Sequence, residues 1–248
     1  MAIGIVTEKV GSMSRVVLVT GGNRGIGLAC AQMLRDAGHK VAITYRSDPP
    51  SAAEGFLCVQ CDVTDNDQVE AAFRKIEEEL GEVEILVSNA GMTADKLAIR
   101  LTDEDFLSVL NANLIGGFRV AKRAVTKMMR ARFGRIIFIG SIVGTIGQPG
   151  QANYAASKAG LVGMARTFAK EFASRNVTVN VVAPGPVATE MFAAVDDDMR
   201  NAITDAVPLG RLAEPSEVAA AVTFLASDAA GFITGAVLPV DGGLGMGG

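Results

Sequence analysis

Short β-branched stretches alternate with longer segments of helical periodicity along most of the chain, and this alternation constrains the fold more than any other feature. Such alternation is typical of a parallel sheet covered by helices, because a crossover between parallel strands needs a helix to return across the sheet. The predicted strands are residues 16–20, 41–45, 56–60, 85–88, 135–140, 178–183 and 236–240. We therefore predict an α/β fold of the Rossmann type, with a doubly wound seven-stranded parallel sheet and helices on both faces.

The length and the apolar pattern predict one domain. The 248 residues are near the upper limit that one hydrophobic core serves. We predict a flexible tail over residues 1–13, with Met13 as an alternative start, and a single domain over 14–248 with a mobile lid at about 186–207. No apolar stretch reaches the roughly 20 residues of a membrane-spanning helix, and the tail does not match a secretory signal.

Charge and rare residues exclude several function classes. The formal net charge of −4 gives no general affinity for nucleic acid or for an anionic membrane. The three cysteines, Cys30, Cys58 and Cys61, complete no metal-binding pattern and are expected to be core thiols in a reducing cytoplasm. The single histidine, His39, lies in a Gly-His-Lys turn, which argues against a histidine base and against a metal centre.

Capping patterns mark the starts of helices. Between the third and fourth strands, apolar residues recur at helical spacing at positions 69, 72, 73, 76 and 80. Thr64 with Asp67 has the spacing of a capping box before that helix, and Thr102 with Asp105 repeats it before a long helix that reaches about Ala131. Residues 153–174 form a second long helical pattern.

A glycine-rich turn follows the first strand and leads into a helix that we expect to begin near Leu28. Glycines allow the backbone to approach a pyrophosphate, whose charge then lies against the free amides of the helix N-terminus. The spacing differs from the usual dinucleotide fingerprint, because three residues separate Gly21 from Gly25. The predicted cofactor-binding residues here are Gly21, Asn23, Arg24, Gly25, Ile26 and Gly27.

The end of the second strand distinguishes NADP from NAD. An acidic residue would bind the ribose hydroxyls of NAD at this place, but the chain has Arg46 there. Together with Arg24 it can form charge-assisted hydrogen bonds to a 2′-phosphate, which favours NADPH. Asp48, two residues further on, is the feature that favours NAD instead.

Tyr154 and Lys158 are four residues apart on a predicted helix, so their side chains leave the same face one turn apart. A neighbouring ammonium favours the phenolate, and the spacing therefore predicts a lowered pKa for Tyr154. Ser141 ends the fifth strand, at the sheet edge where open α/β folds bind ligands. These residues suit the reduction of a ketone, with Tyr154 as proton donor and Ser141 bonded to the carbonyl oxygen.

In combination these motifs resemble the short-chain dehydrogenase/reductase family over nearly the whole chain from Arg15 onward. The resemblance implies a catalytic set of Asn113, Ser141, Tyr154 and Lys158, with Asn113 holding a water in a proton relay through Lys158. It also implies that Tyr154 and Lys158 contact the cofactor. Further cofactor contacts are implied for Asp62 and Val63 at the adenine, for Asn89, Ala90 and Gly91, and for Pro184, Gly185, Val187 and Thr189 near the nicotinamide.

Within that family the chain resembles bacterial, and especially actinobacterial, 3-oxoacyl-[acyl-carrier-protein] reductases. The resemblance rests on the phosphate loop and on residues 88–91, 150–158 and 240–246. It implies NADPH-dependent reduction of 3-oxoacyl-[acyl-carrier-protein] to 3-hydroxyacyl-[acyl-carrier-protein] in fatty-acid synthesis. It also implies a homotetramer built on the two long helices.

A docking surface for acyl carrier protein must be locally basic, because the carrier is acidic and this chain is itself net negative. Residues 127–135 concentrate positive charge before the strand that ends in Ser141, and Arg175 closes the helix of Tyr154. The resemblance assigns the carrier contact to Arg132 and Arg175, which we expect near the entrance of the site. The alternative is that these cations only complement helix dipoles.

Other functions remain open at this point. Within the enzyme class, the alternatives are a reductase of acetoacetyl-CoA or of polyketide intermediates, and another short-chain alcohol or sugar dehydrogenase. From a different class, the alternative is a non-catalytic NADP-binding protein, which the presence of all four catalytic residue types disfavours.

Overall fold

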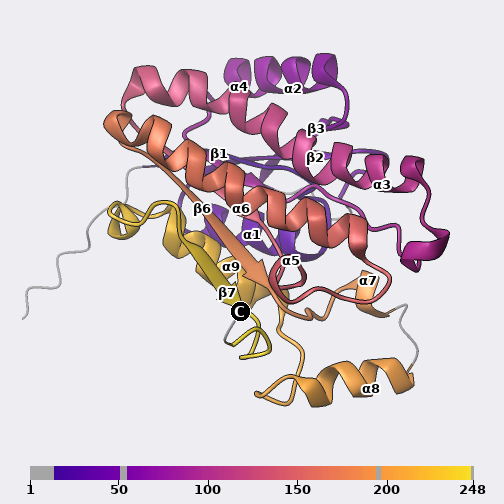
Figure 1. Ribbon diagram of the computed structural model, residues 1–248. Helices are drawn as coiled ribbons and strands as arrows, with labels where there is room; N and C mark the ends of the chain where they lie inside the picture. Colours follow the sequence, from indigo (N-terminus) through magenta and orange to yellow (C-terminus); the bar gives the residue numbers. More distant parts are fainter. Residues whose placement is uncertain (1–13, 51–54, 194–196, 247–248) are drawn as a thin grey trace, which may run out of the picture.

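Seven parallel strands form one sheet at the centre of the molecule. Figure 1 shows the computed structural model, which describes residues 14–50, 55–193 and 197–246. The strands are β1 (Val16–Val19), β2 (Lys40–Tyr45), β3 (Phe56–Gln60), β4 (Ile85–Ser88), β5 (Gly134–Ile139), β6 (Val177–Pro184) and β7 (Val237–Val240). The predicted fold class is confirmed, and each strand agrees with its predicted bounds to within one residue at either end. The tail over residues 1–13 lies outside the described residues.

The order of the strands places a crevice at one edge of the sheet. Across the sheet the order is β3-β2-β1-β4-β5-β6-β7, so the chain builds outward from β1 in one direction and then from β4 in the other. Such a reversal leaves a crevice outside the carboxyl ends of β1 and β4, where open α/β sheets bind ligands. The loops that follow these strands are therefore the ones that position a functional site.

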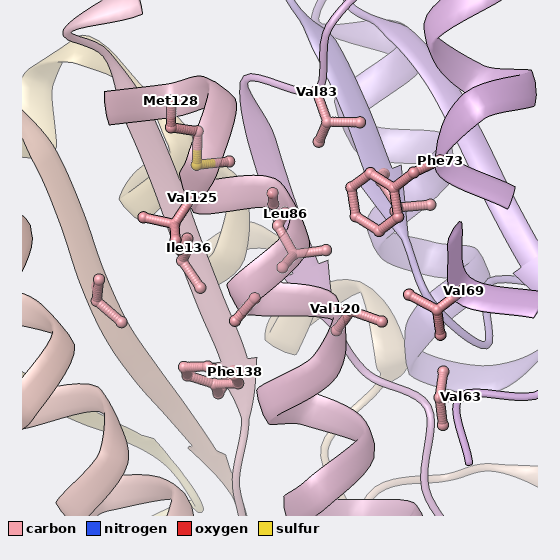
Figure 2. Packing of buried hydrophobic residues seen from close by; sticks show 14 of the residues in the cluster. Val63, Val69, Phe73, Val83, Leu86, Val120, Val125, Met128, Ile136 and Phe138 are labelled. Atoms are coloured by element: carbon pink, nitrogen blue, oxygen red, sulfur yellow. The ribbon is translucent and has the colours of Figure 1, made fainter. Parts of the chain in front are cut away.

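Helices cover both faces of the sheet, as predicted. On one face lie α1 (Gly25–Asp36) and α9 (Pro215–Ala226), and on the other lie α2 (Asn66–Glu79), α4 (Gly116–Ala131) and α6 (Ala152–Phe172) (Figure 1). Each strand contributes alternate side chains to the two faces, so β1 places Leu18 in one core and Val17 and Val19 in the other. Figure 2 shows side chains of α2, α4, β4 and β5 meeting in the first of these cores.

The start of α2 differs from the prediction. Asp65, and not Thr64, is the N-cap, and its carboxylate accepts hydrogen bonds from Asp67 N at 2.9 Å and Gln68 N at 3.2 Å. The Thr64 hydroxyl instead donates to Asp62 Oδ1 at 2.7 Å. The predicted capping box of Thr64 with Asp67 is therefore wrong, because two adjacent residues could cap and the backbone selects the second.

Helix α1 begins earlier than predicted. Leu28 N donates to Arg24 O at 3.1 Å, so Leu28 closes the first turn of the helix and Gly25 is its first residue. The glycine loop therefore continues into the helix without an intervening segment. Its last amides lie at the helix N-terminus, where an anion is stabilised.

The long helix predicted from Thr102 to Ala131 is interrupted. The capping box of Thr102 with Asp105 is confirmed at the start of α3 (Asp103–Leu110). A π-helical turn (Asn111–Ile115) then precedes α4. Such turns occur mostly as single bulges and are frequent at functional sites. This one holds Asn113.

The predicted lid contains two short helices, α7 (Glu190–Ala193) and α8 (Asp197–Ala206), while residues 194–196 lie outside the described residues. Its closure over a substrate stays a prediction. Helix α5 (Val143–Ile146) and three 3₁₀ turns (Ala98–Arg100, Ala173–Arg175, Asp228–Ala230) complete the fold. Within the described part of the chain, no helix combines the length and the apolar character needed to span a bilayer.

Candidate active site

The predicted site residues gather at the carboxyl edge of the sheet. The glycine loop follows β1, the segment 89–91 follows β4, Ser141 follows β5, and Pro184 ends β6. Helix α6 starts at the same edge and carries Tyr154 and Lys158. Residues from five separate elements are thus combined into one site by the parallel arrangement of the strands.

The glycine loop is held in one conformation from two sides. Asn89 Nδ2 donates to Thr20 O at 3.0 Å and to Gly21 O at 2.9 Å. From β2, Thr44 accepts hydrogen bonds from the two glycines that follow Thr20, through its hydroxyl at 3.3 Å and its carbonyl at 3.0 Å. A side chain at Gly27 would place a Cβ 2.3 Å from Gly21 O, so only glycine permits this close approach.

Two threonines in this region were missed by the sequence analysis. The Thr20 hydroxyl accepts hydrogen bonds from Asn89 N and Ala90 N, each at 3.0 Å, and so joins the ends of β1 and β4. Thr44 performs the corresponding role toward β2. Their partners lie 22 to 70 positions away in the sequence, and no local pattern indicates such pairs.

The two arginines predicted to select NADPH are both exposed beside the loop. Among the described residues, neither Arg24 nor Arg46 forms an ion pair, so both guanidinium groups are free to bind a phosphate. The Asp48 carboxylate accepts a hydrogen bond from the Ser47 hydroxyl at 3.0 Å, and its carbonyl holds Asn23 Nδ2 at 3.1 Å. The residues present therefore fit a 2′-phosphate at the end of β2.

The segment predicted to contact the adenine is rigidly placed after β3. Asp62 Oδ1 accepts hydrogen bonds from the backbone and hydroxyl of Thr64, and Asp62 N donates to Gln68 Oε1 at 3.0 Å. Val63 is buried and packs so closely against Gly116 that a Cβ there would lie 2.8 Å from Val63 Cγ2. The turn and the start of α4 therefore fix each other.

Tyr154 and Lys158 lie together, but their electrostatics differ from the prediction. Lys158 is buried, its Nζ donates to Ile139 O at 2.7 Å, and it lies 5.4 Å from the centroid of the Tyr154 ring. Burial lowers the pKa of Lys158 to about 8. The pKa of Tyr154 is raised, mainly by burial and also by Asp95, while a hydrogen bond with Ser141 acts to lower it.

The predicted lowering of the Tyr154 pKa is therefore wrong for this structure. The four-residue spacing does bring the two side chains to one face, but the ammonium bonds to the carbonyl of Ile139 and the phenol is shielded from water. A phenol with a raised pKa stays protonated at neutral pH. That is the form which a proton donor requires.

Asn113 is buried in the π-helical turn, and its side chain is fully used in hydrogen bonds. Nδ2 donates to Met92 O and to Ser157 Oγ, each at 3.0 Å, and Oδ1 accepts from Met92 N at 2.8 Å. Both amide hydrogens are therefore committed to the protein. A relay water at this residue would have to bind the backbone carbonyl, and its presence stays a prediction.

The residues predicted to flank the nicotinamide connect three loops. Pro184 O accepts from Ile142 N at 3.1 Å, and Gly185 N donates to Val240 O at 3.0 Å. A Cβ at Gly185 would lie 2.8 Å from Asp241 Cα, so glycine is required there. Val187 bridges to Ala213, and the Thr189 side chain lies within 3.5 Å of the position that a Cβ on Gly25 would take.

Arg132 and Arg175 lie at the opposite edge of the sheet from this site. Arg132 caps the end of α4 just before β5 begins, and Arg175 precedes β6. Arg132 Nη2 donates to Ser174 O at 3.3 Å, so the two arginines share one surface. Ser141 follows the other end of β5, so within one copy the arginines lie away from the site. Their contact with the carrier protein stays a prediction.

No histidine or thiol of the described residues joins the site. Within that part of the chain no group of three His, Cys, Asp or Glu side chains is arranged to hold a metal ion. His39 accepts a hydrogen bond from Arg15 N at 3.3 Å, far from Tyr154 in the fold at the start of β2. Burial raises the pKa of Cys30 to about 12 and of Cys61 to about 11, which fits unreactive core thiols.

Comparison with known proteins identifies the class to which this geometry belongs. A family model described as enoyl-(acyl carrier protein) reductase matches residues 21–245. The chain belongs to the short-chain dehydrogenase/reductase family.

Its relatives include several reductases with one name. The 3-oxoacyl-[acyl-carrier-protein] reductase MabA of Mycobacterium tuberculosis is 56% identical over 235 residues, which cover 95% of this chain and 94% of the relative. The FabG enzymes of the same name from Escherichia coli and Vibrio cholerae are 48% and 45% identical over 238 residues, covering 94% of this chain and 98% of each relative.

The buried ammonium of Lys158 leads to a prediction about stability. Its pKa falls from 10.5 to about 8 on folding, so at pH 7 holding the charge costs roughly 3 kcal/mol. Replacing it by Met loses the hydrogen bond to Ile139 O, worth about 1 kcal/mol. We expect Lys158→Met to raise the free energy of unfolding at pH 7 by about 1 to 2 kcal/mol, measured by urea denaturation.

The sign of the pH dependence provides the control. Between pH 8 and 10.5 the unfolded chain holds the Lys158 proton and the folded chain does not, so the parent gains stability as pH rises through this window. The advantage of Lys158→Met should shrink over the same window. A variant less stable than the parent at pH 7, or an advantage that does not change with pH, would contradict the burial of a charged lysine.

Proposed function

We propose that the chain is an NADPH-dependent 3-oxoacyl-[acyl-carrier-protein] reductase of cytoplasmic fatty-acid synthesis. One observation carries the proposal. The side chains of Tyr154 and Ser141 share a hydrogen bond beside the buried Lys158, at the sheet edge that also holds the glycine loop. This arrangement delivers a proton to an oxygen, which reduction of a ketone requires. The names and the coverage of the relatives support the carrier-bound 3-oxoacyl group as substrate.

The chemistry divides between the cofactor and the chain. When bound, NADPH supplies a hydride to the ketone carbon. The Ser141 hydroxyl donates a hydrogen bond to the ketone oxygen and orients it. Tyr154 transfers its proton to the same oxygen as negative charge develops there. Lys158 lies beside the Tyr154 ring and would hold the ribose of the bound cofactor. Asn113 links the π-helical turn before α4 to α6 through Ser157.

The assignment of NADPH rests on Arg24 and Arg46. Both are exposed next to the loop and free of ion pairs among the described residues, and the acidic residue typical of NAD binding does not stand at the end of β2. A charge-assisted hydrogen bond contributes about 1.5 to 3 kcal/mol. Each arginine is therefore expected to shift the preference by about tenfold or more.

The cofactor preference is tested by substitution. We expect Arg46→Asp to erase or reverse the preference of kcat/KM for NADPH over NADH, because it replaces an attractive charge by a repulsive one. Arg24→Ala should weaken the preference in the same direction. Arg35→Ala, an arginine on the same helix as the loop but already bonded to Asp36, is the matched control. Equal efficiency of the parent with both cofactors would refute the assignment.

We further propose a homotetramer in which copies pack along α4 and α6. Leu107, Ile115 and Phe118 support this, because they are large apolar side chains left exposed along α3, the π-helical turn and α4. Tyr154 lies at the amino end of α6, and Arg175 follows its carboxyl end. If two copies pack these helices antiparallel, the arginines of one copy lie beside the site of the other.

Docking of the acyl carrier protein across two copies would explain how Arg132 and Arg175 can serve a site although they lie far from the site of their own copy. Arg132 and Arg175 lie too far from their own subunit's Ser141 to border its entrance, since the length of β5 separates them. In an antiparallel pair they would border the partner copy's entrance instead. The acidic carrier would then bind one copy and present its acyl group to the other.

A mixed oligomer tests this arrangement. We expect the double variant Arg132→Glu with Arg175→Glu to lose efficiency toward a 3-oxoacyl carrier protein and to retain it toward a short uncharged ketoester. Co-expressed with Tyr154→Phe, which is expected to be inactive, it should recover roughly a quarter of parental activity, because random pairing gives one complete site in half of the pairs.

Controls separate this outcome from a loss of folding. Charge reversal at Arg74 and Lys75, two exposed residues of α2, should leave both substrates unaffected. Equal losses on the carrier substrate and on the ketoester would assign the arginines to assembly. Absence of recovery in the mixed oligomer would show that the arginines of each copy act on the site of that same copy.

A further inference from the structure

A buried amide side chain stands directly before Tyr154. Asn153 is completely buried in the first turn of α6. Its Oδ1 accepts a hydrogen bond from Tyr154 N at 2.8 Å, and its Nδ2 donates to Ala94 O at 3.0 Å and more weakly to Asp105 O at 3.4 Å. Asn153 thus connects the residue assigned as proton donor to two other elements.

The carbonyl of Tyr154 is held by a second buried side chain. Ser157 Oγ donates to Tyr154 O at 2.7 Å and accepts from Asn113 Nδ2 at 3.0 Å. Both backbone polar groups of Tyr154 are therefore bonded by side chains, one on each side. Asn113 itself bonds to Met92 through its remaining amide hydrogen and its oxygen.

The segment that these side chains hold, residues 92–96, has no regular structure and follows the cofactor-binding residues 89–91. It is attached to the start of α6 at two further points. Gln151 Nε2 donates to Asp95 Oδ2 at 2.8 Å, and Lys96 N donates to Gly150 O at 2.9 Å. Any shift of α6 along this segment would break the bond from Asn153 Nδ2 to Ala94 O as well.

Helix capping alone does not explain an asparagine here. The N-cap of α6 is Gln151, which forms no side-chain cap bond, and capping residues act from that position rather than from inside the first turn. Burying an amide is unfavourable unless every donor is bonded. All the donors of Asn153 are bonded to elements other than α6, so its side chain joins elements and does more than end a helix.

We propose that Asn153 is a positioning residue, which fixes the start of α6 against residues 92–96 and thereby holds the Tyr154 phenol in its reactive place. The proposal rests on the assignment of Tyr154 as proton donor. Displacement of a reacting group by about 1 Å lowers turnover by as much as a hundredfold. Binding of the cofactor depends on other residues, chiefly the glycine loop.

The chain offers a matched control for loss of a buried amide. Asn180 is also buried, in β6, where its Nδ2 donates to Ile233 O at 2.9 Å and its Oδ1 accepts from Ala236 N at 3.1 Å. It bonds backbone groups as Asn153 does, but none of them belongs to Tyr154 or to residues 92–96. Substitution of either asparagine removes comparable bonds.

We expect Asn153→Ala and Asn180→Ala to lower the melting temperature to a similar extent. Only Asn153→Ala should lower kcat with a 3-oxoacyl substrate, by about tenfold to a hundredfold. The KM for that substrate and the Kd for NADPH, measured by fluorescence titration, should stay within about twofold of the parent in both variants. If Asn153 had a purely structural role, its substitution would change the melting temperature without lowering kcat selectively over KM and Kd.

A second variant tests the same point through pH. Asn153→Asp keeps an acceptor for Tyr154 N, but it replaces the amide nitrogen that donates to Ala94 O by a second oxygen. An ionised carboxylate cannot donate to Ala94 O, whereas a protonated carboxyl can. The ratio of its kcat to that of the parent should therefore rise as pH falls from 8 to 6. The other charged groups around it are Asp95, Lys96 and Asp105, and they are common to both proteins.

Each outcome decides the proposal. An unchanged kcat for Asn153→Ala overturns it, as does an equal fall of kcat for Asn180→Ala or a ratio for Asn153→Asp that does not depend on pH. Full activity of Tyr154→Phe would instead overturn the assignment of the proton donor. The two failures are thus distinguishable.

Discussion

The bond between Asn89 and the backbone of Thr20 and Gly21 is the interaction on which the site depends. It joins the loops after β1 and β4 at the point where the strand order reverses. Residues 89–91 continue into residues 92–96, which Asn113 and Asn153 hold. A continuous series of hydrogen bonds therefore runs from the glycine loop to the helix of Tyr154, so one framework positions both the proposed cofactor site and the proposed proton donor.

Burial sets the electrostatics of this framework, at a cost in stability. Lys158 is a cation with 6% exposure, and among the described residues its ammonium donates to the carbonyl of Ile139. The apolar cores on the two faces of the sheet offset the free energy lost by burying this charge. Tyr154 keeps its proton because it is shielded from water and receives repulsion from Asp95. Burial of the Lys158 charge is unfavourable for folding, which is common where a site performs chemistry.

The sequence predicts the elements well where the signal is local. Strands such as Ile85–Ser88 follow from β-branched runs, and the capping box at Thr102 follows from side chains three residues apart. Competing local signals, as at Thr64 and Asp65, need the backbone to decide between them. The predicted catalytic residues do meet, because the parallel sheet brings strand ends together. The predicted shift of the Tyr154 pKa was wrong because spacing does not reveal burial. Asn153 was missed because Ala94 and Asp105, which its amide group joins to α6, are distant in the sequence.

The central claim is that Tyr154 gives its proton to the ketone oxygen. Tyr154→Phe removes that proton and keeps the ring, so single-turnover reduction of a 3-oxoacyl substrate by bound NADPH measures the claim most directly. General acid catalysis contributes about a hundredfold to ten-thousandfold, and a loss of this size is expected. The Kd for NADPH should stay within about twofold of the parent. Reduction at a near-parental rate would contradict the account.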